Sequence, residues 1–172
     1  MDELKWIKLA RQGDKTAFCN LYDRYKDRLY RYAFYRLRNA SDAEDAVSEC
    51  VLSAWKQMGN LREAEAFPAW IFRILSACCN RLIKQQISTK GWVSLEEVPQ
   101  EIQAGTESAE QRLILQDALG SLSEEERNMV LLSVVAGLKS NEIASITNLT
   151  AGSVRSSLSR SMKKMRIYME QR

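Results

Sequence analysis

The sequence predicts an all-α protein built as two small helical domains joined by a flexible linker. Glycine and proline are scarce, with seven and two among 172 residues, which favours helices over strands. Apolar residues recur at helical spacing on both sides of residues 87–107, whereas that stretch breaks every helical period. We therefore expect domains at residues 1–86 and 108–172, with residues 87–107 as the linker.

Composition excludes several classes of protein. No run approaches the ~20 apolar residues that span a bilayer, and acidic residues at positions 2 and 3 stand where a signal peptide begins with basic ones. We therefore expect a cytoplasmic protein without membrane insertion. Histidine is absent, no phosphate-cradling glycine loop is present, and the cysteines lack CxxC spacing, so we expect no metal, no cofactor and no enzymatic activity. Buried reduced thiols are the default interpretation of Cys19, Cys50, Cys78 and Cys79.

Charge is unevenly distributed along the chain, although the net charge is only +3. Residues 91–126 hold nine acidic residues against Arg112 alone, whereas residues 137–172 hold seven basic residues against two acidic ones. An acidic middle between two basic segments suggests a polyanion held by two separate modules.

The N-terminal half begins with two expected helices, one over residues 2–11 and a long one starting at Asp14. The long helix carries an apolar and aromatic stripe that is more typical of a core than of a cofactor site. Its members are Phe18, Leu21, Tyr22, Tyr25, Leu29 and Tyr32.

A third helix is expected from a capping box at Ser41–Glu44 to about Met58, with Gly59 ending it. One face is apolar: Ala46, Val47, Cys50, Val51, Ala54 and Met58. The other is a largely acidic stripe that carries a leucine: Asp45, Ser48, Glu49, Leu52 and Lys56. Such a stripe suits a solvated surface and a docking face for a basic partner equally well.

A fourth helix is expected after Phe67, with Pro68 in its first turn. Its apolar face is Ile71, Ile74, Leu75, Cys78 and Leu82, and a second stripe combines a tryptophan with cations: Trp70, Arg73, Ala77, Asn80, Arg81 and Lys84. A tryptophan among cations can stack an unpaired base while its phosphates are neutralised. A half-buried tryptophan with snorkelling basic neighbours explains the pattern slightly better, so both interpretations stay open.

The C-terminal half predicts four helices. Serines at 108 and 123 open the first two with capping boxes, and Gly137 closes the second. Residues 140–164 then read as a helix-turn-helix, with Asn148 in the turn and Thr150 as N-cap. The second helix has an apolar stripe of Val154, Leu158, Met162, Met165 and Met169, and a face turned well away from that stripe holds Gly152, Arg155, Ser156, Ser159 and Lys163. Small, hydroxylated and basic residues suit a major groove, and the clustered charge favours DNA binding over an ordinary helical hairpin.

Four stretches in this order resemble the extracytoplasmic-function sigma factors of the sigma-70 family, which bind bacterial RNA polymerase: residues 22–37, 41–58, 67–83 and 122–160. The resemblance implies a transcription initiation factor that binds core RNA polymerase and promoter DNA, and that is held inactive by an anti-sigma factor. It assigns core polymerase binding to Asp45, Ser48, Glu49 and Leu52. It assigns the minus-ten element to Arg62, Phe67, Trp70, Arg73, Asn80, Arg81 and Lys84. It assigns the minus-thirty-five element to Thr150, Ser153, Arg155, Ser156, Ser159, Arg160 and Lys163.

Two positions depart from the family pattern. Ser48 stands where glutamine is common, and Ala77 stands where many members have asparagine, so the promoter sequence cannot be carried over. Two other functions compete with this interpretation. One is a helix-turn-helix regulator with an N-terminal sensing or dimerisation domain, which should bind its operator without polymerase. The other is a helical interaction protein that binds no DNA and confers no promoter-specific initiation.

Overall fold

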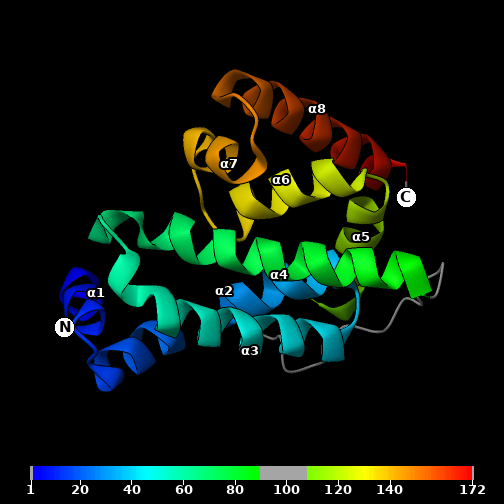
Figure 1. The fold of residues 1–172 in the computed structure, drawn as a ribbon. Helices are drawn as coiled ribbons and strands as arrows, with labels where there is room; N and C mark the ends of the chain where they lie inside the picture. Colours follow the sequence, from blue (N-terminus) through cyan, green and yellow to red (C-terminus); the bar gives the residue numbers. More distant parts are fainter. Residues whose placement is uncertain (1, 90–107, 172) are drawn as a thin grey trace.

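The structure, a computed structural model, describes residues 2–89 and 108–171 (Figure 1). This part of the chain contains helices and turns without a strand, which confirms the all-α prediction. The N-terminal domain holds α1 (Glu3–Arg11), α2 (Lys15–Leu37), α3 (Ala40–Gln57), the short 3-10 turns η1 (Met58–Asn60) and η2 (Ala64–Ala66), and α4 (Phe67–Thr89). The C-terminal domain holds α5 (Ala109–Gly120), α6 (Glu124–Val134), α7 (Ser140–Thr147) and α8 (Ala151–Glu170).

Aromatic side chains from α2 and α4 form the core of the N-terminal domain. Helices α2, α3 and α4 pack against one another in pairs. Tyr32 and Phe72 are fully buried and meet edge to face with ring centroids 5.7 Å apart. Tyr25 meets Phe67 in the same way at 5.2 Å. The aromatic stripe predicted on the second helix therefore lies in the core, where its rings pack edge to face, an arrangement that aromatic pairs prefer.

Helix α3 begins earlier than its sequence suggested. Arg38 ends α2 in the left-handed conformation, with φ of 55°, and leaves Asn39 extended. The Asn39 side chain then accepts a hydrogen bond from the backbone N–H of Asp42 at 2.8 Å. The N-cap is therefore Asn39, and the capping box predicted at Ser41–Glu44 was wrong. Asn39 directly follows the left-handed residue and its side chain can cap a helix. The helix therefore starts after Asn39, and Ser41 lies within its first turn.

Helix α4 carries Pro68 in its first turn, as predicted, because a missing backbone N–H is harmless there. The helix runs to Thr89, three residues past the predicted boundary at residue 86. The rest of the predicted linker, residues 90–107, lies outside the described residues.

The predicted caps of the C-terminal domain are found with one difference. Ser108 and Gln111 form a reciprocal capping box at the start of α5. Ser123 caps α6 by accepting from the backbone N–H of Glu126 at 3.2 Å. The Glu126 carboxylate, however, accepts from Lys164 of α8 at 3.0 Å, so this second box is only half formed. That carboxylate ties α6 to α8 instead of completing the cap.

The apolar stripe of α8 is only partly buried. Val154 and Met165 are buried, whereas Met162 and Met169 are 44% and 45% exposed, so only part of the predicted apolar stripe faces the core. Helix α8 has 20 residues and its neighbours α5, α6 and α7 have 12, 11 and 8, so the shorter helices cannot cover all of it. In the described part of the chain, no helix is long and apolar enough to cross a membrane.

The two domains lie against each other, with α4 running between α2 and α3 on one side and α6, α7 and α8 on the other (Figure 1). Helix α6 contacts α2, and α7 contacts α4. Buried apolar residues of both domains belong to one continuous cluster. The structure thus presents the two domains as a single packed unit.

Candidate nucleic-acid and polymerase interfaces

The face predicted to read DNA on α8 is exposed. Asn148 takes the left-handed conformation, with φ of 58°, in the tight turn between α7 and α8. Thr150 caps α8 by accepting from the Ser153 N–H at 3.1 Å. Buried Val154 and Met165 orient the helix, which leaves the predicted DNA-reading residues on its outer side. These exposed residues are Thr150, Ser153, Arg155, Ser156, Ser159, Arg160 and Lys163.

The corresponding face of α4 is exposed but partly engaged. Trp70 is half-buried and packs on Phe67, with ring centroids 5.9 Å apart. Arg73 donates a hydrogen bond to the Ser145 hydroxyl of α7. Asn80 accepts one from buried Arg36 at 2.8 Å. The tryptophan therefore offers only one part of its ring to a ligand, and two neighbouring polar side chains already have partners.

The remaining residues assigned to the minus-ten element differ in accessibility. Arg62, Arg81 and Lys84 are exposed. Phe67 is only 1% exposed, between Tyr25 and Trp70, so it cannot meet a base directly in this conformation. Its place in the core corrects the expectation of direct contact and makes it a support for Trp70.

The acidic stripe of α3 lies on the surface, as both interpretations of it required. Asp45 and Ser48 are exposed, and Leu52 is 62% exposed although it is a large apolar residue. Glu49 forms an ion pair with Arg81 of α4, and this hydrogen-bonded partner lowers the pKa of the Glu49 carboxyl. The predicted polymerase face and the predicted DNA face therefore meet at one ion pair.

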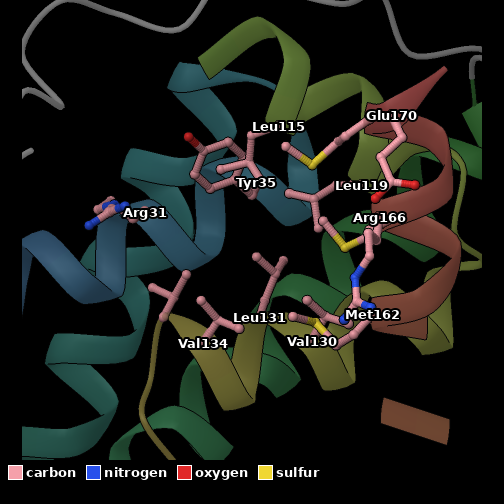
Figure 2. A pocket seen from close by; sticks show the side chains of 13 residues that line it. Arg31, Tyr35, Leu115, Leu119, Val130, Leu131, Val134, Met162, Arg166 and Glu170 are labelled. Atoms are coloured by element: carbon pink, nitrogen blue, oxygen red, sulfur yellow. The ribbon is translucent and has the colours of Figure 1, made fainter. Parts of the chain in front are cut away.

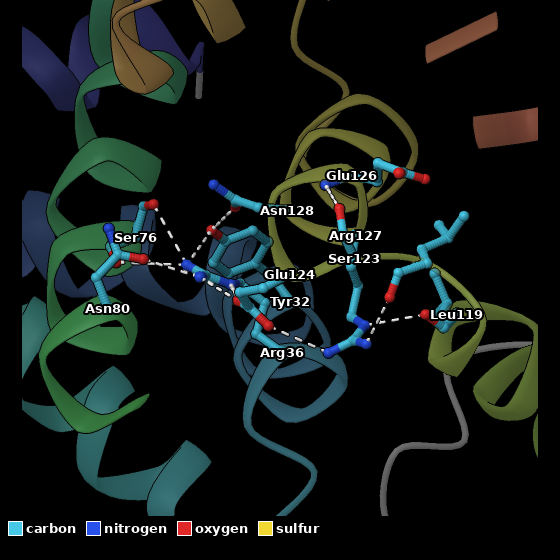
Figure 3. A network of polar contacts seen from close by, with 11 residues as sticks. Tyr32, Arg36, Ser76, Asn80, Leu119, Ser123, Glu124, Glu126, Arg127 and Asn128 are labelled. Atoms are coloured by element: carbon cyan, nitrogen blue, oxygen red, sulfur yellow. Dashed lines mark hydrogen bonds and ion pairs between the residues drawn. The ribbon is translucent and has the colours of Figure 1, made fainter. Parts of the chain in front are cut away.

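Sequence reasoning missed a polar network between the domains (Figure 3). The Arg36 side chain is 2% exposed and pairs with Glu124 of α6 at 2.5 Å. Tyr32 donates to the Asn128 side chain of α6 at 2.5 Å and accepts from Arg36 at 3.2 Å. Burial disfavours the charged form of Arg36, but the carboxylate of Glu124, which pairs with Arg36, outweighs burial and raises the pKa of Arg36. Burial raises the pKa of Tyr32 to about 12, so both groups keep their usual protonation state.

An apolar groove of about 560 Å³ lies between α2 and the C-terminal domain (Figure 2). Its walls come from α5, α6 and α8, and Met162, Met165 and Met169 contribute flexible thioether side chains. Arg31 of α2 and Arg166 of α8 contribute positive charge. Methionine-lined grooves of this kind are typical of surfaces that accept a partner helix.

Three of the four cysteines are buried, as expected, and Cys19 is the exception because it is exposed on α2. Burial raises the pKa of the Cys79 thiol to about 12 and that of Cys50 still further, so these thiols stay protonated and unreactive. Among the described residues, no three His, Cys, Asp or Glu side chains gather as a metal site would need.

Comparisons with known proteins agree with this arrangement. The family model described as Sigma-70 region 2 matches residues 21–89, and Sigma-70, region 4 matches residues 112–165. Each of these two family models matches one of the two helical domains. RNA polymerase sigma factor SigV of Bacillus subtilis is 27% identical over 159 residues, covering 92% of this chain and 95% of SigV. ECF RNA polymerase sigma factor SigM of Mycobacterium tuberculosis is 29% identical over 154 residues, covering 89% of this chain and 77% of SigM.

ECF RNA polymerase sigma factor BldN of Streptomyces coelicolor is 26% identical over 158 residues, and the match spans 88% of this chain but only 60% of BldN. Among solved structures, CnrH in complex with the cytosolic domain of CnrY has a TM-score of 0.74 at 19% identity, with 98% of this chain and 97% of that one covered. This likeness concerns the fold.

Two helical domains matching regions 2 and 4 define a transcription initiation factor. The chain belongs to the sigma-70 family, in its extracytoplasmic-function group.

Proposed function

We propose that this sigma factor binds core RNA polymerase through α3 and directs it to promoters by holding the minus-ten element on α4 and the minus-thirty-five element on α8. The observation that carries the proposal is that the assigned faces of α3 and α8 are exposed, and that of α4 partly exposed, each on a domain of the matching region. In this proposal the N-terminal domain extends to Thr89, where α4 ends, and the C-terminal domain begins at Ser108, the N-cap of α5. Such a factor works by differential binding and performs no covalent step, and it acts in the cytoplasm where the polymerase is found.

The α3 face fits a protein partner better than solvent alone. Leu52 is a large apolar side chain left 62% exposed on the same face, between Glu49 and Lys56 in the stripe. An apolar residue ringed by charges is the usual anatomy of a docking patch, because the apolar contact gives affinity and the charges give orientation. The acidic side chains of Asp45 and Glu49 call for a basic surface on the polymerase.

The α4 face supports strand opening by stacking. Trp70 is fixed from beneath by Phe67, so its exposed part forms a rigid platform for an unpaired base. Arg81 and Lys84 lie further along the same helix, where they can neutralise phosphates. A base that stacks on this platform stabilises the open state, and each stacked base contributes about 1–3 kcal/mol.

Replacing Trp70 with alanine is therefore expected to lower the population of open complexes by roughly 5- to 150-fold, the equivalent of about 1–3 kcal/mol. Closed-complex binding should change much less, because base pairs are still intact there. Permanganate footprinting on a promoter found by genome-wide run-off transcription measures the opening. Trp6→Ala, which changes a half-buried tryptophan on α1, is the control for lost stability. Footprints identical to wild type would remove Trp70 from the opening step.

Replacing Arg155 with alanine is expected to cost about 1–3 kcal/mol at the minus-thirty-five element, because an exposed arginine on a reading helix contacts guanine bidentately. Competition between the natural element and single-base variants measures the loss. Arg166→Ala removes the same charge about three turns further along α8, in the apolar groove, and should leave sequence discrimination unchanged. An equal loss on every sequence would make Arg155 a phosphate contact rather than a base contact.

Run-off transcription with purified core enzyme tests the function as a whole. The expected result is initiation at specific start sites that core enzyme alone does not use. A helix-turn-helix regulator with a sensing domain would instead bind its operator without polymerase. No observation favours that alternative, since the N-terminal domain matches region 2 rather than a sensor.

We also propose an anti-sigma factor as a partner. A solved relative in fold, the sigma factor RpoE of Bartonella quintana, is in complex with the anti-sigma factor NepR, with a TM-score of 0.71 at 20% identity. The apolar groove of Figure 2 is the candidate surface, and its occupant would be an amphipathic helix. Arg31 and Arg166 in the groove favour acidic residues along the polar face of that helix.

A further inference from the structure

A continuous chain of side-chain contacts leads from α1 to the tryptophan on which an unpaired base would stack. Glu3 of α1 accepts a hydrogen bond from the Tyr25 hydroxyl of α2 at 2.7 Å. The Tyr25 ring meets Phe67 edge to face, with centroids 5.2 Å apart and an interplanar angle of 78°. Phe67 in turn packs on Trp70. Glu3 and Tyr25 are thus connected to the promoter-facing side of α4, although neither is assigned to DNA or polymerase.

The Tyr25 ring is held in one orientation from several sides. It is buried, and the Arg28 guanidinium lies over it, 4.4 Å from the ring centroid. Its hydroxyl is fixed by Glu3, whose second carboxylate oxygen pairs with Arg24 at 3.4 Å. Burial, reinforced by Glu3, raises the pKa of Tyr25, so the hydroxyl stays protonated and remains a hydrogen-bond donor. The edge of Tyr25 therefore gives Phe67 a fixed partner to pack against.

Helix α1 also supports the segment that leads into α4. It packs against η1 and η2, the two turns between α3 and α4 (Figure 1). Ile7 and Ala10 of α1 and Leu61 and Ala64 of this segment are all buried in the same apolar cluster. The position of Phe67, which directly follows η2, is therefore set both by α1 and by Tyr25.

We propose that Glu3 and Tyr25 are positioning residues for Trp70, so that promoter opening depends on α1 although α1 carries no residue assigned to DNA. A ring that is already held loses little freedom when a base stacks on it, whereas a loosely held ring must first be ordered at a cost in free energy. The inference rests on the proposed function and deepens it, because it names the residues that prepare the same stacking platform.

The first test is Tyr25→Leu in holoenzyme formed with core RNA polymerase. It removes the ring beneath Phe67, and an edge-to-face pair contributes about 0.5–1.5 kcal/mol. Permanganate footprinting should therefore show a population of open complexes lowered by roughly 2- to 12-fold. Binding to the closed duplex promoter at low temperature should be unchanged.

Phe18→Leu is the matched control for Tyr25→Leu. Phe18 is another buried aromatic residue of α2, but it meets Trp55 of α3 edge to face at 5.1 Å and has no place in the chain of contacts to Trp70. It should open promoters like wild type. All variants are compared at a temperature at which circular dichroism shows native helix content, so that lost stability does not lower the signal.

A double variant separates positioning from a merely structural role. If Tyr25 acts through Trp70, then Tyr25→Leu should cause no further loss of opening in a protein that already carries Trp70→Ala. If Tyr25 only stabilises the domain, the two losses should multiply, because the effects of independent sites add in free energy. Multiplied losses would overturn the proposal.

The hydrogen bond between α1 and α2 is tested by conservative changes that leave the core filled. Tyr25→Phe keeps the ring and removes only the hydroxyl, and Glu3→Ala removes the acceptor of the same bond. Both should lower opening by similar factors, smaller than that of Tyr25→Leu. Glu3→Gln keeps an oxygen that can accept the bond, so it should open promoters like wild type.

The outcomes distinguish the inference from the proposed function. If Trp70→Ala impairs opening but Tyr25→Leu and Tyr25→Phe match Phe18→Leu, the positioning role is wrong and the stacking role of Trp70 stands. If Trp70→Ala itself opens promoters like wild type, the platform is wrong and its positioning residues fall with it.

Discussion

Replacing Asp45 with arginine is expected to lower the affinity for core RNA polymerase at least about a hundredfold. Asp45 is exposed on α3, on the same face as the exposed Leu52 and two helical turns before it. The substitution brings like charges together if the partner surface is basic, and such a juxtaposition costs several kcal/mol. A loss of about 2.8 kcal/mol is already a factor of a hundred. Fluorescence anisotropy of labelled protein titrated with core enzyme measures the dissociation constant.

The matched control for this prediction is Asp27→Arg. Asp27 is equally exposed but lies on α2, outside the acidic stripe of α3, and it undergoes the same reversal of charge. Both variants should melt like wild type, because neither position is buried. If the two variants bind core enzyme with the same affinity as wild type, the acidic stripe is ordinary solvated surface and the docking face must be sought elsewhere.

Asp45 is a sharper probe than Glu49 because of what each carboxylate contacts. Glu49 is paired with Arg81 of α4 in the free protein. A charge reversal at Glu49 would therefore also repel a residue assigned to promoter DNA, and its effects on polymerase and on DNA would be mixed. The pairing further implies that a polymerase group which engages Glu49 competes with Arg81 for the same carboxylate.

The exposed faces of the molecule were predictable from the sequence because they depend on local periodicity. Helical spacing alone places Asp45 and Leu52 on one face of α3, and Arg155 and Ser159 on one face of α8. The turn before α8 was equally local, since Asn148 tolerates the left-handed conformation that it adopts. The cap of α3 was missed although it is local too, because Asn39 lies two residues before Ser41 and both residue types cap helices well.

The interdomain polar network of Tyr32, Arg36, Glu124 and Asn128 was not predictable from the sequence, because its members are distant in sequence and Arg36 breaks a usual rule. Arginine is almost never fully buried unless it is paired, so Arg36 within a helix reads as surface. Its partner Glu124 lies 88 residues away and reads as an ordinary first-turn glutamate of α6. The burial of Phe67 was not predicted for a related reason. A residue at a loop-to-helix junction belongs to no helical period from which the direction of its side chain could be inferred.

Replacing Phe72 with alanine is expected to lower the free energy of unfolding by about 3–5 kcal/mol, the usual range for a fully buried phenylalanine. The Phe72 side chain is completely buried on α4 and meets Tyr32 edge to face. Its loss leaves a cavity beneath the helix that carries Trp70 and Arg73, and it removes the ring that packs against Tyr32. At roughly 2–4 °C per kcal/mol for a chain of this size, Tm should fall by roughly 6–20 °C in a circular dichroism melt.

Ile87→Ala on the same helix is the control for this last prediction, since Ile87 is 72% exposed. Its effect should stay within about 0.5 kcal/mol, as for surface substitutions away from special features. A loss below about 1 kcal/mol for Phe72→Ala would mean that α4 is not anchored to α2 as described. The rigid support beneath Trp70 would then disappear, and with it the physical reason for placing strand opening on this helix.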